Sequence, residues 1–184
     1  MLKLTELQLD IELGNHERAH ERFQQSRPNL GSLTDPYSEV QRLNGAAYLC
    51  YVQRDYVKAR SLLDSSLAMG DRLGHLHNEA TALHYLGSVE LAEGNIDAAK
   101  HNYERSLDIC RETGAAPLAL AVLRRWSEFE SGARKRELLS LVHRDARAAH
   151  HTRVAARKKL LELAPTDRAD LDVPDLWQVV SAFV

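Results

Sequence analysis

A five-residue string near the start of the sequence has the spacing of a zinc hydrolase. His16, Glu17, Arg18, Ala19 and His20 read His-Glu-x-x-His. On a helix this spacing puts two imidazoles on one face for zinc, with the glutamate as general base. No Gly-x-x-His follows to supply a third ligand. The string leaves a zinc hydrolase as an alternative function, which metal analysis would decide.

Other residues that could carry chemistry form no catalytic set. His75, His77 and His84 lie close in sequence, and His150 and His151 are adjacent, but histidines on helical arrays are mostly surface or half-buried polar residues. The sequence contains no phosphate-binding Gly-x-x-x-x-Gly-Lys-[Ser/Thr] or Gly-x-Gly-x-x-Gly loop and no Gly-x-Ser-x-Gly elbow. We therefore predict a protein that is not an enzyme, with no catalytic residue, no metal site and no cofactor.

Positive charge is concentrated in one segment. Residues 132–160 carry nine Lys or Arg against two acidic residues, whereas residues 1–131 carry 14 against 19 and residues 161–184 one against five. The basic residues of the segment are Arg134, Lys135, Arg136, Arg144, Arg147, Arg153, Arg157, Lys158 and Lys159. Such a run can contact phosphates, so nucleic-acid binding stays an alternative function. It lacks interleaved aromatic residues, and docking against an acidic part of the chain or a sister domain explains it equally well.

The composition favours helices. The 184 residues are 44% hydrophobic and only 6% aromatic, and Ala and Leu dominate the apolar residues. Cys50 and Cys110 have no neighbouring partner, which favours a reducing compartment. Acidic residues in the first fifteen positions argue against a signal peptide, and no apolar stretch is long enough to span a membrane. We expect a cytoplasmic protein.

The chain repeats itself every 40 residues. Segments 14–26, 54–66 and 94–106 align without gaps. The shared columns are Asn15/Asp55/Asn95, Ala19/Ala59/Ala99, Phe23/Leu63/Tyr103 and Ser26/Ser66/Ser106, with Leu7/Ala47/Gly87 upstream. An Asn or Asp that opens the segment is typical of a helix N-cap, and the small Ala lets two helices approach closely beside the large residue. Each unit is therefore predicted to be two helices joined by a short turn.

The third unit defines the expected elements best. Its helices are predicted over residues 78–92 and 96–112, joined by a turn in which Gly94 adopts a positive φ. Asp35 followed by Pro36 predicts the N-cap and first position of the helix that opens the second unit. A single hairpin of this kind cannot bury its apolar face, so neighbouring hairpins must stack.

These columns resemble the tetratricopeptide repeat (TPR) family, most clearly through Leu83, Leu86, Gly87, Gly94, Ile96, Ala99, Tyr103 and Ser106 of the third unit. The resemblance implies an all-α fold, an α-α superhelix of antiparallel helical hairpins. We expect three repeats in residues 1–113, and a degenerate fourth repeat with C-terminal capping helices in residues 114–184, as one continuous domain. The first unit departs from the family at Lys3 and Glu6, and the family's proline after the second helix is absent from its usual place.

The resemblance also implies a binding surface. In TPR arrays the first helices of the repeats line a concave groove that takes a protein, a peptide or another effector. The positions that match are Gln8, Asn44, Tyr48, Tyr51, Thr81, His84, Ser88, Leu91, Arg124 and Glu128. The Lys/Asn pattern with which chaperone-binding TPRs hold a terminal carboxylate is missing. We therefore predict a scaffold or sensor rather than a co-chaperone, and the sequence leaves its oligomeric state open.

Residues 136–163 are similar to the C-terminal segment of bacterial signal-transduction ATPases of the STAND type, many of which are transcriptional regulators with a C-terminal TPR-like sensor. The similarity consists of paired leucines, a Thr-Arg pair and Ala-x-x-Lys-Lys-Leu-Leu spacing. It implies that the chain is part of a signalling or transcription-regulating protein, whose other domains are then among its partners.

The last twelve residues predict a further amphipathic helix. Leu176, Trp177, Val180 and Phe183 fall on one helical face. A repeat array exposes an apolar face at its end, and a terminal helix can cover it. We expect this helix to cap the array or to enter the groove, and Trp126 to pack in the core of the last hairpin.

Overall fold

The structure, a computed structural model, describes residues 18, 21 and 35–163. Every regular element in these residues is helical. The elements are α3 (Pro36–Val52), α4 (Tyr56–Leu73), α5 (Leu76–Ala92), α6 (Ile96–Thr113), α7 (Ala116–Trp126), the 3-10 helix η1 (Ser127–Phe129), α8 (Gly132–Arg144) and α9 (His150–Glu162). The predicted all-α, TPR-like helical repeat is confirmed. Most of the first repeat and the predicted helix near the C-terminus lie outside the described residues.

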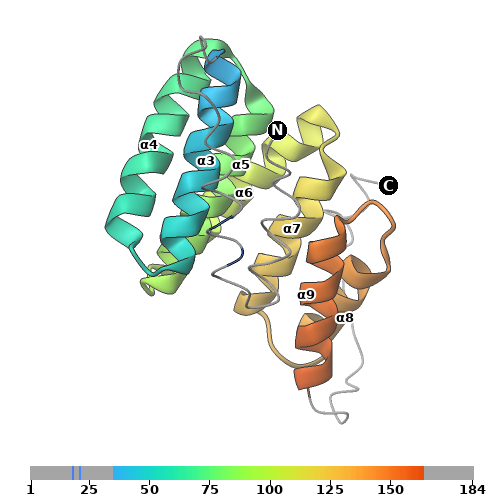
Figure 1. Cartoon of the computed structure of the whole chain (residues 1–184). Coiled ribbons are helices and arrows are strands. Elements are labelled where there is room, and N and C mark those ends of the chain that lie inside the picture. The colour runs from blue at the N-terminus through green and yellow to red at the C-terminus, as the bar shows by residue number, and fades with distance from the viewer. Residues whose placement is uncertain (1–17, 19–20, 22–34, 164–184) are drawn as a thin grey trace. The chain divides into compact units, whose positions relative to one another are not determined.

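Contacts divide the chain into two compact units, with the boundary inside α6 between Ile109 and Cys110. The first unit contains α3, α4, α5 and most of α6. The second contains the end of α6, then α7, η1, α8 and α9. Within the first unit α3 and α4 form an antiparallel pair, drawn in blue and teal, and α8 and α9 form another in the second (Figure 1).

The helices of the first unit begin where their capping residues predict. The carboxylate of Asp35 accepts hydrogen bonds from the backbone N–H groups of Tyr37 and Ser38, and Pro36 opens α3. Asp55 caps α4 in the same way through the N–H of Lys58. These bonds satisfy donors that the first helical turn leaves unpaired, so Asp35 and Asp55 are confirmed as N-caps. The side-chain amide of Asn95, which was also predicted as an N-cap, donates to Glu90 Oε2.

The turns between the paired helices need a left-handed residue. Gly94 has a φ of 83° between α5 and α6, as its type predicts. Arg54 occupies the same repeat column between α3 and α4, and its φ is 63°. A side chain is disfavoured in this region, so the turn of the α3–α4 hairpin is strained where that of the α5–α6 hairpin is not.

The two helices of each hairpin differ in burial. We call α3 and α5 the inner helices and α4 and α6 the outer helices. On α5 buried residues occur on all sides, from Asn78 to Glu90, whereas α4 buries a narrow stripe of Ala59, Leu63, Ser66 and Gly70. A helix that is buried all round is packed between neighbours, and one with a single buried stripe covers a core. The inner helices are therefore held on several sides.

At one position α5 packs closely against α6. A Cβ atom added to Gly87 would lie 2.7 Å from ring carbons of Tyr103, whose side chain is fully buried. The corresponding pair of the preceding hairpin, Ala47 and Leu63, lies fully buried in one core cluster. The predicted combination of a small residue on one helix and a large residue on the other is thus present in both hairpins.

The second unit packs α7, α8 and α9 together. Its core includes Leu139, Val142 and Ala156, all fully buried. Trp126 is half-buried at the end of α7, where its indole contacts the Phe129 ring edge to face and its Nε1 donates to Glu130 Oε1 at 3.3 Å. The tryptophan thus anchors the bend between α7 and α8.

Candidate functional site

Many of the side chains predicted to line a groove are buried within their own units. The buried ones are Asn44, Tyr48, His84, Ser88 and Arg124, each with at most 6% of its surface exposed. The partly exposed ones are Tyr51, Thr81, Leu91 and Glu128. Gln8 lies outside the described residues. Seven of the nine described residues lie on the inner helices α3 and α5, while Arg124 lies on α7 and Glu128 in η1. The repeat columns did not foresee that neighbouring side chains of the chain itself cover five of the nine.

Asn44 is buried because it joins three helices. Its amide oxygen accepts a hydrogen bond from Ser66 Oγ of α4 at 2.7 Å, and its amide nitrogen donates to the carbonyl of Asn78 on α5 at 3.3 Å. A buried amide needs such partners, since an unpaired one costs about 1–3 kcal/mol. Asn44 therefore holds the array together and is not available to a ligand.

Ser88 and His84 are covered by Tyr103 of α6. The hydroxyls of Ser88 and Tyr103 lie 3.1 Å apart, and the His84 ring is tilted against the Tyr103 ring at a centroid distance of 5.9 Å. These polar positions of α5 therefore face the outer helix of their own hairpin.

A short stack of tyrosines connects the two inner helices. Tyr48 of α3 stacks on Tyr85 of α5 with ring centroids 4.9 Å apart, and Tyr51 lies parallel to Tyr48 at 6.1 Å. Offset stacking of this kind stabilises aromatic pairs by about 0.5–1.5 kcal/mol beyond burial. The buried pair thus forms a rigid base beneath the partly exposed Tyr51.

The surface that remains for a partner in the first unit is small. We call Tyr51, Thr81 and Leu91 the inner-helix rim. Tyr51 and Leu91 occupy the same repeat column near the ends of α3 and α5, two helices in direct contact. The Thr81 hydroxyl donates to the backbone carbonyl of His77 at 2.9 Å, so its one donor is already used. The rim is therefore mainly aromatic and apolar.

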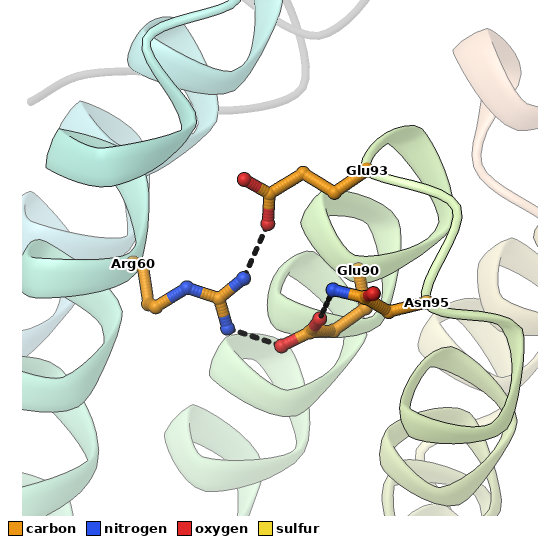
Figure 2. Close-up of polar contacts among 4 residues, drawn as sticks. All are labelled: Arg60, Glu90, Glu93 and Asn95. Carbon is orange, nitrogen blue, oxygen red and sulfur yellow. Dashed lines mark hydrogen bonds and ion pairs between the residues drawn. The ribbon is translucent and has the colours of Figure 1, made fainter.

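A charged cluster that the sequence analysis did not single out joins consecutive hairpins. Arg60 of α4 forms ion pairs with Glu90 and with Glu93 at the end of α5, and the Asn95 amide donates to Glu90 Oε2 at 2.8 Å (Figure 2). The Glu90 side chain is only 9% exposed. The sequence signal that could have indicated this cluster is Glu90 itself. It is a glutamate in an apolar inner helix, at the repeat column that Cys50 occupies in α3.

Within the cluster, Arg60 and Glu90 each favour the charged form of the other. The hydrogen bond from Arg60 holds the pKa of Glu90 below its ordinary value, against the effect of burial, and the bond from Asn95 acts in the same direction. The same contact raises the pKa of Arg60. A buried carboxylate that is fully paired serves as a structural link, and the cluster shows no acid or base prepared for catalysis.

The basic segment is partly neutralised within the second unit. Glu128 forms ion pairs with Lys159 and Lys135. Burial raises the pKa of this carboxyl, but the two lysines act in the opposite direction and hold the pKa below its ordinary value. Arg147 pairs with Asp145 at 2.7 Å. Lys135, Arg147 and Lys159 are thus paired with carboxylates of the second unit. Arg157 and Lys158 are exposed and form no ion pair with a described residue.

The described part of the chain does not support a metal centre. In residues 18, 21 and 35–163 no group of three or more His, Cys, Asp or Glu side chains is placed to hold a metal ion. His16 and His20 of the zinc-hydrolase string lie outside these residues, so the string is not tested. The same residues include no helix with the length and apolar character needed to cross a membrane.

Comparison with known proteins agrees with the repeat architecture. Residues 40–112 match the sequence model of the tetratricopeptide repeat family, which covers α4, α5 and nearly all of α3 and α6 but less than half of the chain. No curated protein and no solved structure matches the chain significantly. The match and the fold of α3 to α6 together support a TPR-like helical repeat in the segment that contains both described hairpins of the first unit. TPR repeats generally bind proteins.

Proposed function

We propose that the chain is a non-catalytic scaffold that binds a segment of a partner protein through the inner-helix rim. The observation that carries the proposal is the exposure of Tyr51 and Leu91. They share a column of consecutive inner helices, and each stays partly exposed directly after a run of four buried residues, 47–50 in α3 and 87–90 in α5.

The packing beneath the rim suits recognition. Tyr51 rests on the buried Tyr48–Tyr85 stack, so its ring has little freedom to lose when a partner binds. A tyrosine offers an apolar ring and a polar hydroxyl, and such residues are enriched where proteins meet. Leu91 adds an apolar contact in the next repeat. An extended or helical peptide that places apolar side chains on both repeats fits this arrangement.

A finer version of the proposal concerns the larger protein. The similarity of residues 136–163 to STAND-type regulators supports a sensor module of a bacterial transcriptional regulator in the cytoplasm, where the buried thiols of Cys50 and Cys110 stay reduced. A nucleotide-binding module encoded upstream in the same gene product would support this version. If the full gene product lacks such a module, this finer version is rejected and the scaffold proposal is unaffected.

The scaffold proposal is tested with a partner isolated on the wild-type chain and then purified. We expect Leu91→Ser to weaken its binding at least tenfold, about 1.4 kcal/mol, because an apolar contact is lost at the rim. The matched control is Val57→Ser, since Val57 is 81% exposed on the outer helix α4. Calorimetric titration of both variants is decisive. Equal effects of the two substitutions, or none, would contradict a binding site on the inner helices.

A further inference from the structure

Helix α9 has one solvent-facing side with an unusual composition. At 3.6 residues per turn, Arg153, Val154, Arg157, Lys158 and Leu161 fall within an arc of about 140°. Arg157, Lys158 and Leu161 are exposed, Leu161 by 78%, while Arg153 and Val154 are partly exposed. We call these five residues the α9 cationic face. It combines three positive charges with two aliphatic side chains. His150, also exposed, lies within the same arc, and exposed Glu162 follows Lys158 by one helical turn at its edge.

The opposite side of α9 shows what the chain does with a cation that serves its own fold. Ala155 and Ala156 are buried there, and Lys159 forms an ion pair with Glu128. In contrast, Arg153, Arg157 and Lys158 form no ion pair with any residue in the part of the chain that the structure describes. The contrast separates Lys159, which serves the fold, from three cations that pair with no described residue and stay at least partly exposed.

The three solvent-facing cations are not explained by helix stability. Arg153 and Arg157 are four residues apart on the same face, a spacing at which like charges repel. Arg153 also lies in the N-terminal part of α9, where the helix dipole disfavours a cation. Lys158 lies in the C-terminal part, where the dipole favours it, so its charge alone carries no functional meaning. Helix stability therefore does not account for the two arginines, and their charges are available to an anionic partner.

We propose that the α9 cationic face binds an acidic amphipathic segment of a partner protein. Carboxylates pair with Arg153, Arg157 and Lys158, and an apolar side chain of the same segment covers Leu161 and Val154. Guanidinium groups bind carboxylates through paired hydrogen bonds, which sets the spacing that such a segment needs. This surface belongs to the second unit and is independent of the inner-helix rim.

The aliphatic side chains favour a protein over a nucleic acid. A phosphate backbone neutralises cations but offers no apolar surface to Leu161, and the face has no aromatic ring on which a base could stack. A single exposed leucine is ordinary on protein surfaces. Here Leu161 lies on the same side of α9 as Arg153 and Arg157. This combination fits a ligand that carries both acidic and apolar side chains.

The experiment uses the full chain and three fluorescent probes. The first probe is a synthetic 16-residue helical peptide with Glu on one side and Leu at the boundary. The second has Lys in place of Glu, and the third is a 16-base-pair DNA duplex. The test variant is Arg157→Glu with Lys158→Glu. The control variant, Arg72→Glu with Lys58→Glu, makes the same change in net charge on exposed residues of α4. Binding is measured by fluorescence anisotropy at 0.15 M and 0.5 M salt.

We expect the acidic peptide to bind the wild-type chain more tightly than the Lys peptide and the duplex. The test variant should lose at least tenfold in affinity for it, the control less than twofold, and Leu161→Ser about threefold. Affinity should fall at the higher salt, since ion pairs contribute. Equal losses in the test and control variants would overturn the proposal, as would failure of the acidic peptide to bind. Tighter binding of the duplex that the test variant abolishes would assign the face to nucleic acid instead.

Discussion

The α3–α4 and α5–α6 hairpins follow the same 40-residue pattern but fill it with different residues. Where the inner helix carries Ala47 the outer helix carries Leu63, and where it carries Gly87 the outer helix carries Tyr103. One methyl group more on one helix thus accompanies a smaller side chain on the other. The two hairpins thus keep a similar total side-chain volume at this contact between the helices. Each residue of such a pair has to be interpreted together with the other.

Polar groups differ between the hairpins in the same way. Ser66 donates to the side chain of Asn44, whereas Ser106 donates to the backbone carbonyl of Ala80 at 2.8 Å. Both serines are fully buried and share a column. The same residue type therefore satisfies a side-chain amide in one hairpin and a main-chain group in the other.

The largest expected effect comes from adding a methyl group to the tighter hairpin. Gly87→Ala places a carbon 2.7 Å from the buried Tyr103 ring. Overpacking costs about 1–3 kcal/mol, and a close contact with a ring that cannot move belongs at the upper end. Alanine regains about 1 kcal/mol of helix propensity, so we expect a net loss of about 2 kcal/mol in the free energy of unfolding. Urea denaturation measures it.

A second substitution sharpens this test. Gly87→Ala combined with Tyr103→Leu recreates the Ala47–Leu63 pair, and we expect the two changes to be coupled favourably by about 1 kcal/mol or more. Simple additivity of the two single effects would show that the contact between α5 and α6 is not volume-limited.

An intermediate effect is expected from one substitution made in both hairpins. Ser66→Ala leaves the buried amide oxygen of Asn44 without its donor and should cost about 1–1.5 kcal/mol. Ser106→Ala removes one bond from a carbonyl that lies in a helix and should cost about 0.5–1 kcal/mol. Unfolding free energies of the two variants, measured side by side, give the difference. A larger loss for Ser106→Ala than for Ser66→Ala would contradict the expectation that the bond to the Asn44 amide contributes more to stability.

The smallest effect concerns the column in which α3 has Cys50 and α5 has Glu90. The pKa of Glu90 in the folded chain lies below its ordinary value of 4.5. The carboxylate therefore adds stability above pH 4.5, and this contribution is lost as the pH falls through the folded pKa. Glu90→Gln should show a weaker loss of stability below pH 4.5 than the wild type. Melting temperatures between pH 3 and 7 measure this, and parallel curves would exclude a contribution of Glu90.

The sequence predicted the elements of this fold better than its surface. The helix starts at Pro36 and Tyr56, and the turn at Gly94, follow from local chemistry, because N-caps and positive φ values depend on a few neighbouring residues. The left-handed Arg54 was not predicted, since its residue type disfavours that conformation. In that turn the packing of the hairpin outweighs the local preference.

The candidate site was harder to predict for a related reason. A repeat column states which side of a helix a residue occupies, but not whether a neighbour covers it. Asn44 and Ser88 were predicted as groove residues, and hydrogen bonds to other helices bury both. Those partners lie 22, 34 and 15 residues away, a separation at which residue types alone do not reveal a contact.

The position of Arg60 has a consequence for how the array folds. The arginine belongs to one hairpin and both of its carboxylate partners to the next (Figure 2). In a linear repeat chain, stability is the sum of what each repeat contributes alone and what each boundary between neighbours contributes. The Arg60 ion pairs belong to the boundary term, so they exist only when both hairpins are folded. They therefore favour unfolding of the two hairpins together and oppose local unfolding of either hairpin alone.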